Sequence, residues 1–109
     1  GRTDDPLMPP PDPRPESDIV FVETTYGDRT HPIETPESEI EKVLEKVVRE
    51  NSVLVIPAFA VGRTQNLVYY FAKLFERRKD LQIPLYVNSP MARDVTELYL
   101  HHGRWHSLG

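Results

Sequence analysis

The sequence contains no cysteine, which excludes a disulfide framework and a metal site built from thiolates. Long apolar runs are also missing: the longest, residues 53–61, contains Pro57 and is far too short to cross a bilayer. The polar, proline-rich first residues do not have the pattern of a signal peptide. We therefore expect no membrane association and a cytoplasmic location.

An excess of positive charge is absent as well. The net charge of -4 argues against a protein whose overall field attracts nucleic acid, although a local group of arginines can still bind phosphate. With 39% hydrophobic residues, 109 residues can bury one modest core, which is small for a free-standing enzyme domain. We expect one domain, or part of one.

The chain divides into two segments of different composition. Residues 1–17 hold six of the eleven prolines, and proline removes the amide donors that a helix or a sheet needs. This segment is therefore predicted to be an extended, proline-rich lead-in. The apolar pair Leu7 and Met8 in its middle could pin it across another surface. Residues 18–109 are predicted to form a partial α/β domain.

Three apolar runs without polar alternation predict strands that are covered on both faces, at residues 18–23, 52–58 and 84–88. Each is followed by a helix signal: Thr35 before a proline, then Gly62, then Ser89 before a proline. Asn51 is expected to end the first helix. The residues expected to face the core are Ile40, Val43, Leu44, Val47 and Val48 in the first helix, Leu67, Phe71, Leu74 and Phe75 in the second, and Met91, Val95 and Leu98 in the third.

This alternation predicts an α/β fold, a three-layer Rossmann-like βαβαβα arrangement with a short parallel sheet and right-handed crossovers. Three parallel strands leave edges unpaired and helix faces uncovered. The predicted sheet is therefore expected to be part of a larger fold, or to be completed by a partner subunit such as a second copy of the chain.

In α/β proteins ligands bind where strands give way to loops, which makes the ends of the predicted strands candidate sites. Glu23 lies at the end of the first run, where a partly desolvated carboxylate can donate a proton, accept one or orient a histidine. The alternative is a cap or a turn. For Asp28 and Arg29, a few residues later, a local ion pair around the turn is the favoured interpretation.

The better candidate for an anion site begins at Gly62. It runs from Gly62 through Arg63 and Thr64 to Gln65: the glycine lets the backbone approach closely, helix-start amides point outward, and the Arg63 guanidinium can bind a phosphate with two donors. The alternative is ordinary helix initiation. Ser89 likewise could bind phosphate or simply cap its helix. Neither a P-loop ending nor a Gly-x-Gly-x-x-Gly motif is present, which disfavours a nucleotide-binding Rossmann domain.

The four histidines do not predict a metal site. His31 stands alone, and His101, His102 and His106 lie near the end of the sequence. Adjacent histidines on a helix point about 100° apart, so they do not share a metal as an i, i+4 pair would. We expect helix-end or solvent-facing histidines and no metal ligands in these 109 residues.

Taken together, three phrases resemble a known family. Residues 23–29 (ETTYGDR), 56–65 (IPAFAVGRTQ) and 88–92 (NSPMA), the last followed by TELY at 96–99, are similar to the β-CASP branch of the metallo-β-lactamase superfamily. That branch includes RNase J and the cleavage and polyadenylation endonuclease. The likeness covers nearly the whole chain, and three phrases in the right order are more specific than any one of them.

The resemblance implies a segment of a zinc-dependent RNA-processing nuclease, in which a metal-activated hydroxide attacks RNA phosphodiesters. Glu23 matches the first acidic position of the family, which acts with a histidine in proton transfer. Arg63, Gly62, Thr64 and Ser89 fall in segments that line the RNA cleft. In the family order the metal ligands precede this segment, so we expect zinc and a metallo-β-lactamase domain in a full-length parent and no activity from this chain alone. The alternative is a free-standing, non-catalytic module that binds RNA or dimerises.

Overall fold

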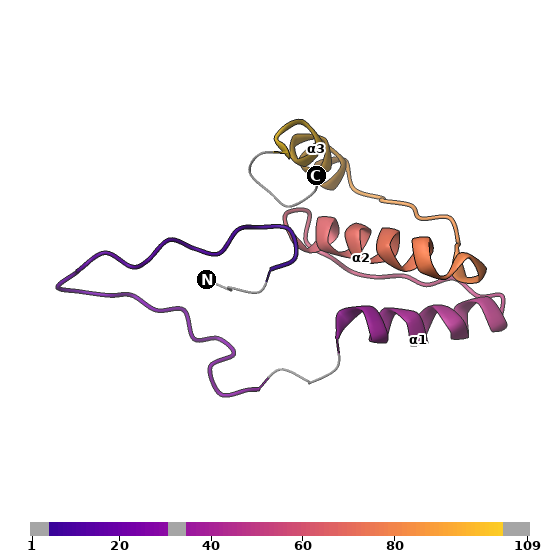
Figure 1. Cartoon of the computed structure of the whole chain (residues 1–109), viewed down its shortest axis with the longest axis horizontal. Coiled ribbons are helices and arrows are strands. Elements are labelled where there is room, and N and C mark those ends of the chain that lie inside the picture. Colours follow the sequence, from indigo (N-terminus) through magenta and orange to yellow (C-terminus); the bar gives the residue numbers. More distant parts are fainter. Residues whose placement is uncertain (1–4, 31–34, 104–109) are drawn as a thin grey trace.

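The computed structural model describes residues 5–30 and 35–103, and there it consists of helices joined by irregular segments. The elements are α1 (Pro36–Arg49), α2 (Arg63–Arg77), a short 3₁₀ helix η1 (Lys79–Leu81) and α3 (Pro90–His101). α1 and α2 lie side by side, and the segment before α1 extends far from the helices (Figure 1). None of the helices in these ranges has the length and apolar character needed to cross a membrane.

The predicted α/β fold is wrong for the described part of the chain, because none of the three apolar runs forms a strand there. Their side chains are exposed rather than covered: Phe21 is 97% exposed, Val53 88% and Tyr86 89%. An extended run becomes a strand only when its N–H and C=O groups form hydrogen bonds with a neighbouring extended segment. Among the described residues the three runs do not pair in this way, so the Rossmann-like parallel sheet is absent.

The three helices, by contrast, lie where the sequence predicts them. Thr35 caps α1, and its hydroxyl accepts a hydrogen bond from the Ser38 N–H at 3.3 Å. At the other end Asn51 adopts a left-handed backbone with φ of 47°, and the Ser52 N–H donates to the Val47 carbonyl at 3.0 Å. This is a Schellman ending, and it explains why Asn51 terminates the helix as predicted.

A small core holds α1, α2 and η1 together. Partly buried apolar residues from the connecting segments, Leu54 and Ile83, pack against it. The predicted stripe on α1 is only partly buried, since Val43 and Val48 are each 41% exposed. The buried members of the cluster are Leu44, Phe71, Leu74, Phe75 and Leu81.

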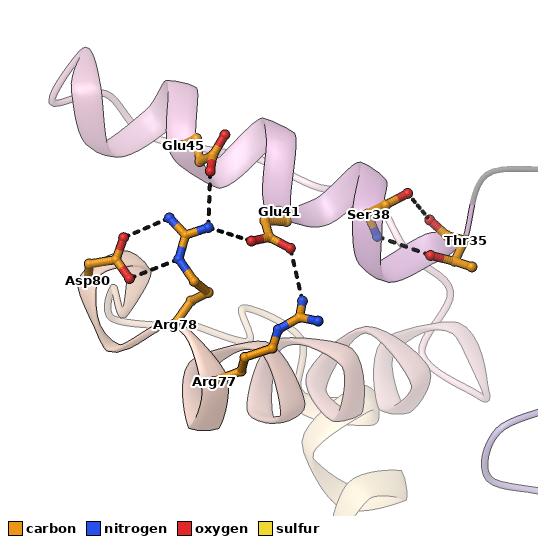
Figure 2. A network of polar contacts seen from close by, with 7 residues as sticks. All are labelled: Thr35, Ser38, Glu41, Glu45, Arg77, Arg78 and Asp80. Carbon is orange, nitrogen blue, oxygen red and sulfur yellow. Dashed lines mark hydrogen bonds and ion pairs between the residues drawn. The ribbon is translucent and has the colours of Figure 1, made fainter.

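A network of charged side chains joins the end of α2 to α1 (Figure 2). The Arg78 guanidinium donates to both carboxylate oxygens of Asp80, at 3.0 and 2.7 Å, and also reaches Glu45 at 3.1 Å and Glu41. Arg77 donates to Glu41 at 2.9 Å. The hydrogen bonds with Arg78 lower the pKa of Asp80. The hydrogen bonds that Arg78 donates to Asp80, and next to Glu45, raise the pKa of Arg78. The network fixes the turn after α2 against the exposed side of α1.

The face of α3 that packs inward differs from the prediction. Of the three residues predicted to face the core, Val95 is partly buried, whereas Met91 is 64% exposed and Leu98 59% exposed. Ala92 is buried, and Thr96 and Tyr99 are partly buried. The predicted stripe counts only apolar side chains. The observed inward face includes Thr96, whose hydroxyl accepts a hydrogen bond from Gln65 and donates one to the Ala92 carbonyl. α3 is therefore rotated about its axis relative to the prediction.

Within the lead-in, Leu7 is completely buried and Met8 is 45% exposed. Leu7 does not belong to the core cluster between α1 and α2. The sequence predicts that Leu7 and Met8 fix the lead-in to another surface, and the burial of Leu7 agrees with this. The boundary at residue 17 stays a prediction.

The backbone turns sharply just before α2. Gly62 has φ of 76° and ψ of -63°, and across it the Arg63 N–H donates to the Val61 carbonyl at 3.0 Å. A hydrogen bond over three residues with these angles is a classic γ-turn, a rare and strained conformation. A side chain at this position is strained even though the space around it is open.

We predict that Leu44→Ala lowers the free energy of unfolding by about 2–5 kcal/mol, because it opens a cavity in the core. The matched variant Val43→Ala, which truncates a half-exposed neighbour on the same helix, should cost less than about 1 kcal/mol. Urea unfolding followed by far-UV circular dichroism measures both. Equal costs would show that Leu44 is not central to the packing.

Gly62→Ala should lower the free energy of unfolding by about 1–3 kcal/mol, because alanine is strained at this φ. Val61→Ala changes the neighbouring, 63% exposed side chain and should shift stability by no more than about 0.5 kcal/mol. The same urea titration compares the two variants. A Gly62→Ala protein as stable as the parent would contradict the γ-turn.

Candidate nucleic-acid interface

Side chains of the first turn of α2 hold the loop that precedes it. The Thr64 hydroxyl donates to the Phe59 carbonyl at 2.8 Å, and the Gln65 side-chain amide donates to the Ala60 carbonyl at 3.1 Å. Thr64 is 9% exposed and Gln65 3%. The Gly62 turn is therefore supported from the helix side by two buried polar groups.

Gln65 also connects α2 to α3. Its Nε2 donates to the Thr96 hydroxyl at 3.0 Å and lies 3.5 Å from the Ala92 carbonyl. Thr96 in turn donates to that carbonyl at 2.7 Å. The Gln65 Oε1 is buried and has no hydrogen-bond partner in the described part of the chain, which costs about 1–3 kcal/mol. The Gln65 side chain thus connects α2 to the loop before it and to α3, and it leaves one buried acceptor without a hydrogen bond.

The start of α3 lies next to this contact. Ser89 is the N-cap, and its hydroxyl accepts a hydrogen bond from the Ala92 N–H at 3.2 Å. The capping role that the sequence predicts is therefore present. A hydroxyl that accepts in a cap keeps its own hydrogen as a donor.

Thr64 and Ser89 line a common groove of about 870 Å³. Its walls are the segment from α1 to α2 and the segment from η1 to α3, residues 51–58 and 83–89, which Figure 1 shows on their way to the two helix starts. α2 contributes Leu67 and Phe71. The groove is mostly apolar, and Thr64, Asn88 and Ser89 contribute polar groups at the end where α2 and α3 begin.

Arg63 is the first residue of α2 and is exposed. Within residues 5–30 and 35–103 it has no carboxylate within ion-pair distance, whereas Arg77 and Arg93 each pair with one and Arg78 pairs with three. The first turn of α2 also contains no acidic residue. Among the described residues its guanidinium thus has no ion-pair partner, and it stands at the start of a helix, the end that favours anions.

Glu23 occupies a different environment. Its carboxylate accepts a hydrogen bond from the Thr25 N–H at 2.6 Å inside an exposed turn. Hydrogen bonding by the Thr25 side chain, and next by its N–H, lowers the pKa of Glu23 below its usual value. Asp28 and Arg29 form the expected local pair at 3.5 Å. Glu23 is ionised near neutral pH, which suits a base or an orienting group better than a proton donor.

The structure does not bring Glu23 to the groove. It is not among the lining residues, and its segment extends away from the helices (Figure 1). Gly62, Arg63, Thr64 and Ser89, on the other hand, gather at the neighbouring starts of α2 and α3. The predicted catalytic role of Glu23 therefore stays a prediction.

The histidines that the structure describes are bonded to their own helix. Nδ1 of His101 lies 2.7 Å from the Glu97 carbonyl, and Nδ1 of His102 lies 3.0 Å from the Leu98 carbonyl. His31 and His106 lie outside the described residues. In the described ranges no three His, Cys, Asp or Glu side chains are placed to hold a metal. The described residues therefore do not fit a zinc site.

Sequence reasoning missed the role of Gln65. The signal is its position three residues after the helix N-cap, where Gln often hydrogen-bonds back to the capping segment. Two further residues, Asp5 and Asn66, form a contact across 61 positions, with Asn66 Nδ2 donating to Asp5 Oδ2 at 3.2 Å. No local pattern predicts such a pair.

Comparison with known proteins supports the resemblance. Residues 64–109 match the Beta-Casp domain. The chain is 36% identical over 100 residues to Ribonuclease TTHA0252 of Thermus thermophilus. The aligned region covers 91% of this chain and 23% of that protein. It is 31% identical over 95 residues to Cleavage and polyadenylation specificity factor 73 of Drosophila melanogaster, covering 85% of this chain and 14% of that one.

A fungal relative gives the same result: Endoribonuclease ysh1 of Schizosaccharomyces pombe is 29% identical over 89 residues, covering 80% of this chain and 12% of its own length. No solved structure matches the chain. The chain thus spans less than a quarter of each of these relatives. With the three phrases in order and these matches along most of its length, the chain belongs to the β-CASP branch of the metallo-β-lactamase superfamily.

Proposed function

We propose that this chain is an RNA-contacting segment of a zinc-dependent nuclease that hydrolyses RNA phosphodiesters, and that Arg63 binds a phosphate of the RNA. The observation that carries the proposal is the exposed guanidinium of Arg63 at the start of α2, free of carboxylates among the described residues. The names of the relatives, ribonuclease and endoribonuclease, supply the substrate class.

The two longer helices of the core differ at their starts in a way that supports this assignment. α1 begins with Glu37 and Glu39 in its first turn, and these carboxylates compensate the positive end of its dipole. α2 begins with Gly62, which has no side chain to cap the helix, and carries no acidic residue in its first turn. The Arg63 N–H is used by the γ-turn, so what α2 offers an external anion is the positive end of its dipole together with the Arg63 guanidinium.

Gly62 contributes space as well as backbone shape. Apart from Gly62 itself and its two chain neighbours, no described residue has an atom within 4 Å of the position where its Cβ would stand. A phosphate oxygen can approach the backbone there more closely than it could beside a side chain. Ser89 lies nearby with a hydroxyl hydrogen to donate. Because the Thr64 hydroxyl is already used by the Phe59 carbonyl, we assign Thr64 to holding the turn.

Catalysis is proposed only for a longer protein. The described residues do not group metal ligands, so we propose that zinc, when present, is held by other parts of such an enzyme and that this chain alone does not cleave RNA. In the complete enzyme the ionised Glu23 would accept or orient a proton. A cytoplasmic location and a metallo-β-lactamase domain as partner belong to the same proposal. Dimer formation stays a prediction.

Arg63→Gln should weaken binding to a single-stranded oligouridine about 10-fold, because one charge-assisted contact to phosphate is lost. The slope of log affinity against log salt should fall by about 0.7, as expected for one phosphate on a single strand. Fluorescence anisotropy over a salt series measures both quantities.

Arg49→Gln is the matched control, since it removes the same charge at the far end of α1, where Arg49 pairs with Glu50. It should change the affinity less than about 2-fold. If both variants weaken binding equally, the effect is one of overall charge and Arg63 is not a phosphate contact.

We also predict that the 109-residue chain, incubated with zinc and passed through gel filtration, retains no stoichiometric zinc and leaves the oligouridine intact. The reason is that the described residues do not group ligands for the ion. Elemental analysis and gel electrophoresis of the RNA are the measurements. Tight zinc at one ion per chain together with cleavage would overturn the view that this chain is catalytically incomplete.

A further inference from the structure

Within residues 5–30, the part of the long segment before α1 that the structure describes, the buried contact with the rest of the chain lies at Leu7. From residue 8 to residue 30 every side chain is exposed, whereas Leu7 just before them is completely buried. The Asp5 Oδ1 accepts hydrogen bonds from the Leu7 and Met8 N–H groups, both at 2.9 Å. An aspartate that receives amides two and three residues ahead closes a local turn, and this turn directs Leu7 inward.

The same carboxylate also reaches α2. The Asp5 Oδ2 accepts from the Asn66 side-chain amide at 3.2 Å, and the Tyr99 hydroxyl on α3 lies 3.8 Å from the Met8 sulfur. Figure 1 shows the segment passing beside the start of α2 at this point. One carboxylate therefore closes the turn with one oxygen and ties it to α2 with the other.

Asn66 is also part of the first turn of α2. Its N–H makes the first hydrogen bond of the helix, to the carbonyl of the N-cap Gly62 at 3.0 Å, while its side chain donates to Asp5. Arg63 lies three residues earlier on the same turn. The Asp5 contact and the first hydrogen bond of α2 therefore meet in one residue.

We infer that Asp5, Leu7 and Asn66 form a latch that fixes the proline-rich segment to the start of α2 and positions Arg63 for RNA. The inference rests on the proposed function for its RNA part. Asp5 and Asn66 are positioning residues, because they act on Arg63 through the helix start and do not themselves contact RNA. The latch is a tertiary contact, and this distinguishes it from a local turn that leaves α2 unaffected.

An exchange of the two side chains tests the latch. Asn66→Asp places two carboxylates opposite each other and should break the contact. Adding Asp5→Asn restores one donor and one acceptor, and the double variant has the net charge of the parent chain. Its new amide at position 5 can still accept the Leu7 and Met8 N–H bonds through Oδ1.

Hydrogen exchange of the Leu7 and Met8 amides is the first measurement. We expect Asn66→Asp to reduce their protection about 10-fold, and the double variant to return it to within about 3-fold of the parent. Far-UV circular dichroism controls for loss of the helices. If the single variant leaves these amides unchanged, or if the double variant fails to restore them, the turn is local and the latch is wrong.

Affinity for the single-stranded oligouridine is the second measurement. Asn66→Asp should weaken binding, and the double variant should recover it even though a carboxylate still stands at position 66. If the double variant stays weak, the added charge near Arg63 explains the loss and the positioning role is wrong. If the parent chain binds no oligouridine, the proposed function fails, while the amide protection still decides whether the latch exists.

Discussion

The packing of α1 against α2 is the constraint on which the rest of the structure depends. Leu44 fills the contact between the helices, and the Arg78 network closes its far end. α2 in turn carries the groups that hold the loop before it, α3 and the proline-rich segment. An apolar contact of a few side chains therefore supports every polar contact at the candidate interface.

The helices could be predicted because their signals are local. The Thr35 cap, the left-handed Asn51 and the Ser89 cap act within a few residues, and each sets a helix boundary in the structure. The strands could not, because an apolar run such as 18–23 becomes a strand only through hydrogen bonds to a distant segment. Composition shows that such a run can be extended, but it does not show that a partner lies beside it.

The candidate site was predictable to the same degree. Gly62 and Arg63 are recognisable from a glycine before a helix, and the structure adds the γ-turn and the absence of nearby carboxylates around Arg63 in its described part. Contacts made by Gln65 and by Asp5 depend on residues 27 to 61 positions away. For α3, the Gln65 contact to Thr96 also explains why the inward face differs from the apolar stripe. Polar pairs of this kind leave no periodic signal in a sequence.

Helix geometry explains how one turn of α2 can serve so many neighbours. Successive side chains on a helix point about 100° apart, so four consecutive residues cover all directions around the axis. Thr64 reaches the preceding loop, Gln65 reaches α3 and Asn66 reaches the lead-in. Arg63 takes the remaining direction and is exposed. Because three of the four side chains are held by contacts within the protein, the backbone from which Arg63 projects is fixed, which reduces the backbone part of the ordering cost of binding an anion there.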